Sequence, residues 1–184
     1  MFATQIKNFS AEIEQFAQDQ LITHKTRDLM DTDFGEPSKL LTDGHFSIVK
    51  ICTADTAQKD CWKTLAGGKD KVTYKNLDGK NANPTLKNLT VILKNGIMFI
   101  CSKSSAYPDF IVIRVDVNGN DKPNIVGRDF FGFYLDRKGH VTRFPYNKNI
   151  THAERVKQCK ASTSTAAQYY CFDALVENNW KMDY

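Results

Sequence analysis

The spacing of apolar residues predicts a helix at the start of the chain. Large apolar side chains recur there at alternating intervals of four and three residues, with polar side chains between them. That spacing places the apolar side chains on one stripe of a helix. We expect an N-terminal helix over residues 1–30 that packs its stripe on a sheet, because the pattern is too short to establish a coiled coil. The stripe consists of Phe2, Ile6, Phe9, Ile13 and Phe16.

From residue 86 onward the apolar period changes to two, which is typical of β-strands. Lys94-Asn95-Gly96 suits a hairpin turn, because glycine readily adopts positive φ. Residues 86–145 are therefore expected to form an antiparallel meander of four or five short strands. The expected strands are residues 86–93, 97–102, 110–117, 130–135 and 141–144.

The remaining segments are predicted less sharply. Residues 31–85 form a polar connecting region, in which residues 38–51 are compatible with either a short helix or an extended segment. Residues 146–184 form a C-terminal region, with helical turns expected at 153–159 and 166–178. One amphipathic helix cannot bury its stripe alone, whereas an antiparallel sheet with an apolar face covers it. We therefore expect one α+β domain over residues 1–184.

Composition and charge narrow the function. Apolar residues make up 41% of the chain and aromatic residues 11%, as in a globular protein, and the formal net charge is +4. Lys and Arg are interleaved with Asp and Glu, so we expect no nucleic-acid partner. No window approaches the roughly 20 apolar residues of a membrane helix, and no cleavable signal peptide is visible.

The five cysteines are spaced for local disulfides. Eight residues separate Cys52 from Cys61, and eleven separate Cys159 from Cys171. Each such loop, if closed, would stabilise the fold by roughly 2–3 kcal/mol. Cys101 is then left in an apolar strand as a buried thiol. The alternative is that all five cysteines are reduced in a cytosolic protein. A zinc site is disfavoured, because no spacing of cysteine or histidine residues fits a zinc finger.

Catalytic signatures are missing from the sequence. The chain has no GxSxG, P-loop, HExxH or GxGxxG motif. The apolar neighbours of Cys101 argue against a thiol nucleophile. The four histidines lie in polar, loop-like stretches with no two at i, i+4 spacing, so we expect them to be exposed and the protein not to be an enzyme. They are His24, His45, His140 and His152.

Oxygen-bearing side chains gather in the loop after the strand expected at 110–117. An EF-hand needs Gly at position six and Glu at position twelve, where this chain has Asp121 and Gly127. Two interpretations stay open: a calcium site of another kind, or a turn in which Asp and Asn side chains bind backbone N–H groups. The candidate calcium ligands are Asp116, Asn118, Asp121 and Asp129.

Three patches of the chain resemble type IV pilins and the pseudopilins of type II secretion. They are the loop from Val115 to Phe133, the pair Cys61-Trp62, and the ending Cys171-Phe-Asp-Ala-Leu-Val-Glu-Asn-Asn-Trp180-Lys181. Some pseudopilins carry calcium in a C-terminal loop. The resemblance implies a non-enzymatic structural subunit at the cell surface or in the periplasm. Its partners would be other pilin or pseudopilin subunits and, through an N-terminal helix, a membrane.

The resemblance also implies a longer first helix. Such proteins begin with a basic leader, a cleavage site after Gly and an apolar helix with an early Glu, none of which precedes Phe2 here. We therefore expect this chain to be the extracytoplasmic domain without the apolar half of that helix, with Met1 as a start residue at the cut. The stripe would continue into the filament core as an assembly surface.

Two alternatives to assembly stay open. One is a secreted module that binds carbohydrate or a host surface through exposed aromatic residues and the loop from Asp116 to Asp129. Such a module would need no long apolar helix at its N-terminus. The other is a cytosolic thiol protein, which free cysteines at all five positions would favour.

Overall fold

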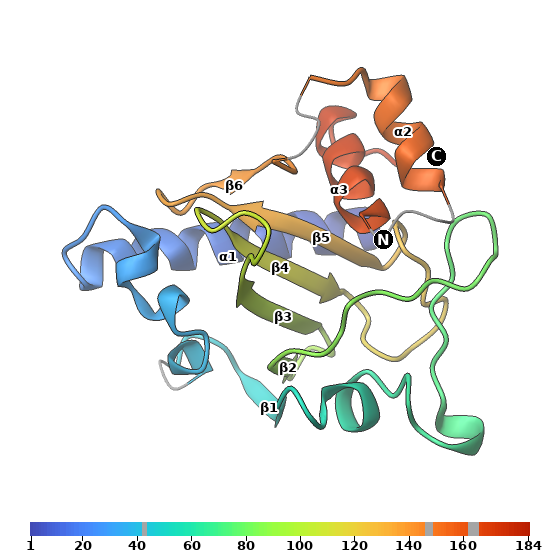
Figure 1. Cartoon of the computed structure of the whole chain (residues 1–184), viewed down its shortest axis with the longest axis horizontal. Coiled ribbons are helices and arrows are strands. Elements are labelled where there is room, and N and C mark those ends of the chain that lie inside the picture. Colours follow the sequence, from blue (N-terminus) through green and yellow to red (C-terminus); the bar gives the residue numbers. More distant parts are fainter. Residues whose placement is uncertain (42–43, 146–148, 162–165) are drawn as a thin grey trace.

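The computed structural model describes residues 1–41, 44–145, 149–161 and 166–184 (Figure 1). Within these ranges, three α-helices, five short 3-10 or π-helical turns and one sheet make up the regular structure, so the fold is α+β, as predicted. The helices are α1 (Phe2–Thr23), α2 (His152–Lys160) and α3 (Ala167–Glu177). The strands are β1 (Ile48–Cys52), β2 (Thr90–Leu93), β3 (Met98–Lys103), β4 (Ile111–Asp116), β5 (Phe130–Leu135) and β6 (Val141–Thr142).

The sheet is a meander in which each strand pairs antiparallel with the next strand along the chain. The predicted type is confirmed, but the count of four or five strands is wrong, because β1 adds a sixth. β1 lies in the stretch that the sequence left ambiguous, of which residues 42–43 are outside the described part. Its apolar residues Val49 and Ile51 are exposed at a sheet edge, so the sequence of β1 does not show the apolar pattern of a buried strand.

Helix α1 lies across one face of the sheet (Figure 1). Its stripe is buried from Ile6 to Phe16, and Phe2 is partly buried. The ring of Phe9 lies 5.3 Å from Phe99 of β3 and 6.5 Å from Phe133 of β5. The helix therefore buries its apolar side against the middle of the meander, as the spacing of the stripe predicted.

Helix α1 is shorter than the predicted range of 1–30, because it ends at Thr23. Lys25 has a φ of 52°, in the left-handed region. The N–H groups of Lys25 and Thr26 donate to the carbonyls of Ile22 and Leu21. This pair of bonds is a Schellman motif, which stops a helix by turning the chain back over its last turn.

The connecting region is part of the core and covers the other face of the sheet. Trp62 and Tyr74 pack there with Met98, Ile100 and Phe130 in a second apolar cluster. Tyr74 and Phe130 have ring centroids 5.1 Å apart. The sheet is therefore sandwiched between α1 on one face and irregular chain on the other.

Both expected disulfides are present. Cys52 is bonded to Cys61, and Cys159 is bonded to Cys171, while Cys101 is a buried free thiol. The second bond joins α2 to α3. Helix α3 packs on β5, which accommodates the helix through Gly132, because a side chain there would collide with Tyr169.

Candidate functional site

The loop between β4 and β5 begins at a buried carboxylate. Asp116 accepts a hydrogen bond of 2.7 Å from the hydroxyl of Tyr74 and one of 3.1 Å from the N–H of Asn118. Its side chain is inaccessible to solvent. Burial, and next the negative charge of Asp129, raise the pKa of Asp116 well above its usual value. Asp116 thus fastens the loop to the connecting region through Tyr74.

A second buried carboxylate closes the same loop. Asp129 accepts hydrogen bonds of 2.6 Å from each of two backbone N–H groups, those of Asn124 and Ile125. Burial raises the pKa of Asp129, although these backbone N–H groups pull it in the opposite direction. The carboxylate takes the place of a missing backbone acceptor for this turn.

Asparagine side chains complete the fastening. Asn118 donates from Nδ2 to the carbonyls of Asp121 and Lys122, at 2.9 and 3.1 Å. Asn120 donates at 2.7 Å to the carbonyl of Cys61, which ties the loop to the first disulfide. The interpretation of the loop as a turn held by Asp and Asn side chains agrees with these bonds.

The structure brings only part of the candidate calcium set together. Asp116 and Asp129 are close enough for their charges to interact, whereas the side chain of Asp121 is exposed. Within the described ranges, no three His, Cys, Asp or Glu side chains are grouped as metal ligands. The Oδ1 atoms of Asn118, Asn120 and Asn124 are buried without a hydrogen-bond donor. Calcium binding stays a prediction.

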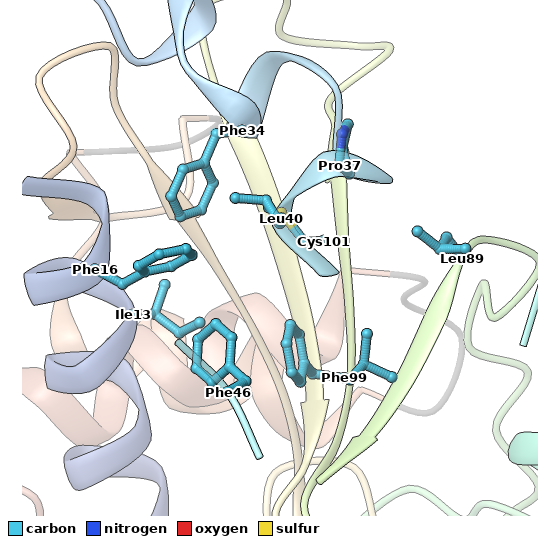
Figure 2. A pocket seen from close by; sticks show the side chains of 10 residues that line it. Ile13, Phe16, Phe34, Pro37, Leu40, Phe46, Leu89, Phe99 and Cys101 are labelled. Carbon is cyan, nitrogen blue, oxygen red and sulfur yellow. The ribbon is translucent and has the colours of Figure 1, made fainter. Parts of the chain in front are cut away.

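An apolar pocket lies between α1 and the sheet (Figure 2). Figure 2 shows the rings of Phe16, Phe34, Phe46 and Phe99 gathered around it. Its free volume is about 10 Å³, which is about the space of one water molecule. The pocket is therefore filled by the protein's own side chains.

Cys101 lines this apolar pocket. The residue is buried, and burial raises the pKa of its thiol far above the usual range. At neutral pH it is accordingly protonated, and a protonated thiol is neither a nucleophile nor a metal ligand. Its position agrees with the expectation of a buried, inert thiol.

The histidines are separated from one another, and each has a different neighbour. His24 lies 3.7 Å from Asp33, and His140 lies 3.5 Å from Glu14. His45 stacks on Phe16 with ring centroids 4.1 Å apart. His152 alone contacts two carboxylates, Glu177 and Asp183, and it is partly buried where the sequence predicted exposure.

Exposed apolar residues mark a surface that the sequence did not reveal. The side chains of Val49 and Ile51 on β1 are 62% and 47% exposed. The outer side of β1 pairs with no strand in the described part of the chain. An unpaired edge with exposed apolar side chains is a ready site for contact with another chain. The sequence would have indicated this surface only if residues 48–52 had been assigned to a strand.

Comparison with known proteins does not assign a family to this chain. No protein-family model, curated protein or solved structure matches the chain. Among the described helices, none has the length and apolar character needed to cross a membrane. The two disulfides are typical of proteins that fold in an oxidising compartment outside the cytosol.

Proposed function

We propose that this chain is the extracytoplasmic domain of a structural subunit of the pilin or pseudopilin type. The observation that carries the proposal is the architecture: one long helix lies along a consecutive antiparallel meander, and a disulfide closes the C-terminal helices. The domain acts at the cell surface or in the periplasm. Its partners are other subunits of the same class, and a helix ahead of Phe2 anchors it in the membrane before assembly.

The buried stripe limits how α1 contributes to assembly. Four stripe side chains are buried in the domain's own core and so have almost no surface left for a neighbouring subunit; they are those of Ile6, Phe9, Ile13 and Phe16. In this proposal the stripe fixes the direction in which the helix leaves the domain. The lateral contacts between domains come from exposed surface, of which the edge of β1 carries two exposed apolar side chains, Val49 and Ile51.

The test uses the gene with its natural upstream sequence, expressed in a host with a matching assembly machinery. Sheared surface fractions and membrane fractions are probed for the protein, and filaments are sought by electron microscopy. We expect co-assembly with the host's subunits. A full-length protein that is never found in a membrane or with other subunits would overturn the proposal.

A matched pair of variants tests the role of β1. Val49→Asp places a charge on the exposed edge, and Leu65→Asp makes the same change at a residue that is 67% exposed elsewhere. We expect Val49→Asp to reduce the assembled fraction several-fold and Leu65→Asp to leave it unchanged. Equal effects of the two variants would exclude β1 as the contact.

A further inference from the structure

A groove opens on the face of the sheet opposite α1. Cys101 and Phe133 lie on the α1 face, so their neighbours Ser102 and Tyr134 lie on the other face. The groove has a volume of about 550 Å³, which is within the range of small-molecule sites. It is bounded by β3, β4, β5, the loop at residues 104–107 and the start of α3. We call it the Arg114 groove.

Arg114 reaches into this groove because its neighbour has no side chain. It lies on β4 opposite Gly132 of β5, over which the ring of Tyr169 packs. The Nε–H of Arg114 donates to the hydroxyl of Tyr169 at 2.9 Å. This bond holds the guanidinium plane in place and leaves both terminal nitrogens for another acceptor.

The charge of Arg114 is not compensated within the described part of the protein. No carboxylate there forms an ion pair with it. The residues that line the groove include Lys103 and Arg114 but no Asp or Glu. A partly buried guanidinium without a counterion favours a bound anion, and its planar fork fits a carboxylate.

The start of α3 adds to the positive potential. Ala166 and Gln168 at the start of α3 line the groove, and no acidic residue lies in the first turn of α3. The N-terminal end of a helix carries partial positive charge. The groove thus combines two cationic side chains with a favourable helix end.

Aromatic rings form the walls. Tyr134 stacks on Phe144 at 5.7 Å and Phe144 stacks on Tyr169 at 5.1 Å, while Tyr107 meets Tyr134 edge-on at 6.1 Å. Ser102 adds a hydroxyl beside them. The stacked rings are nearly buried against one another, so the flat apolar surface open to a ligand is mainly that of the partly exposed Tyr107 at the rim. Such a surface next to hydrogen-bonding groups suits a ring with one apolar face and several hydroxyls.

We propose that the Arg114 groove binds an acidic sugar, a pyranose ring that carries a carboxylate. The carboxylate accepts hydrogen bonds from the terminal nitrogens of Arg114, and the ring lies against the aromatic wall. This site does not depend on the proposed assembly function, since it uses neither α1 nor β1.

The test compares ligands on the folded wild-type protein. Methyl glucuronide, methyl glucoside and inorganic phosphate are titrated while NMR chemical shifts or calorimetry report binding. We expect methyl glucuronide to bind at least about tenfold more tightly than the neutral glucoside, because a charge-assisted bond to arginine is lost with the carboxylate. Equal binding of the two sugars, binding of phosphate alone, or no binding would each overturn the proposal.

Variants then locate the site. We expect Arg114→Gln to weaken methyl glucuronide binding about tenfold or more, and Arg114→Lys to give an intermediate loss because the charge stays but the fork is removed. Tyr107→Ala, at a partly buried rim residue, should also weaken it several-fold. Arg128→Gln, at an exposed arginine outside the groove, should change nothing. Thermal melting checks that each variant is folded. If Arg114→Gln does not fold, Tyr107→Ala becomes the deciding variant. Unchanged binding of methyl glucuronide to Tyr107→Ala would then overturn the proposal.

Discussion

Gly127 lies against the C-terminal disulfide in a backbone conformation that other residues rarely adopt. Its φ is +86°. A Cβ atom at this position would lie 2.5 Å from the Sγ of Cys171 and 3.4 Å from the Sγ of Cys159. Neither the sulfur atoms nor the two helices that carry them can move away freely, because the disulfide and α3 are buried. Glycine is required here for two separate reasons.

Gly127→Ala and Gly96→Ala separate these reasons. Gly96 has a φ of +88° but has no atom within 4 Å of its ideal Cβ. We expect Gly96→Ala to lower the free energy of unfolding by about 1 kcal/mol from backbone strain alone. Gly127→Ala should lose about 2 kcal/mol more from the steric collision. Urea unfolding without reductant measures the free energy of unfolding of both variants. Equal decreases would show that the disulfide and its helices shift to make room for the methyl group.

At the residue scale, the sequence identified the important positions and their local bonds within the loop, but not their distant partners. Asp116 and Asp129 were singled out as oxygen donors, and both are buried. The partner of Asp116 is Tyr74, 42 positions away, which no local pattern reveals. In the sequence, Gly127 was noted only because it stands where an EF-hand has a glutamate ligand. Its contact with a distant disulfide cannot be inferred from the neighbouring residues.

At the scale of elements, α2 and α3 share a buried charge cluster besides their disulfide. Arg155 of α2 is completely buried and lies 3.1 Å from Asp173 and 3.2 Å from Glu177 of α3. Asp173 also accepts the backbone N–H of Phe144 at 3.1 Å. His152 contacts Glu177 at 3.1 Å. The cluster joins the two helices to the segment after β6.

The cluster makes stability depend on pH near neutrality. Burial, opposed by the Phe144 N–H and Arg155, raises the pKa of Asp173 to about 7. Hydrogen bonds that the ring of His152 donates to Asp183 and Glu177 raise the pKa of His152. Both groups therefore bind protons more strongly in the folded state. Their stabilisation is complete below the pKa of the unfolded chain and is lost as pH rises through the folded pKa.

We accordingly expect the free energy of unfolding to fall between pH 5 and pH 8, with about 2 kcal/mol of the decrease from Asp173. Asp173→Asn should flatten this dependence, since asparagine keeps an acceptor for Phe144 but does not titrate. Urea midpoints at four or five pH values measure it. A midpoint that rises over this range would contradict the assignment.

A strand with a continuous apolar run was predicted closely, and edge elements were not. β5 has the predicted bounds, because its residues are buried along their whole length and read as one apolar run. The strand predicted at 86–93 begins only at Thr90. β1 was not predicted, because three of its five residues are exposed and its sequence therefore lacks the pattern of a buried strand. The end of α1 escaped because Lys25, and not glycine, adopts the left-handed turn.

On the scale of the whole molecule, the oxidation state of the cysteines is the most direct check of the compartment. The two disulfides leave one thiol, that of Cys101, inside the apolar core. The folded protein should therefore expose no reactive thiol. A protein that folds in the reducing cytosol would instead keep its cysteines as thiols.

Thiol titration with a chromogenic disulfide reagent distinguishes these cases. We expect no reaction in the native protein, one thiol per chain after unfolding in guanidinium, and five when a reductant has been applied and removed. More than one thiol in the unfolded, unreduced protein would contradict the disulfide pairing and favour a cytosolic protein.

The global arrangement was only partly accessible to sequence patterns. The α+β class and the meander follow from one helical and one strand period, and both are confirmed. The second core around Trp62 and the Arg114 groove depend on how irregular chain folds over the far face of the sheet. Irregular chain has no period, so neither feature could be predicted.

The packing of α1 has a consequence during synthesis. Phe9 leaves the ribosome early, but its contact Phe133 follows more than a hundred residues later. At ordinary elongation speeds this interval is roughly 6–25 s. Until β3 and β5 have been made, the stripe of the nascent helix has no sheet to cover it, so its apolar surface is open to association with other molecules.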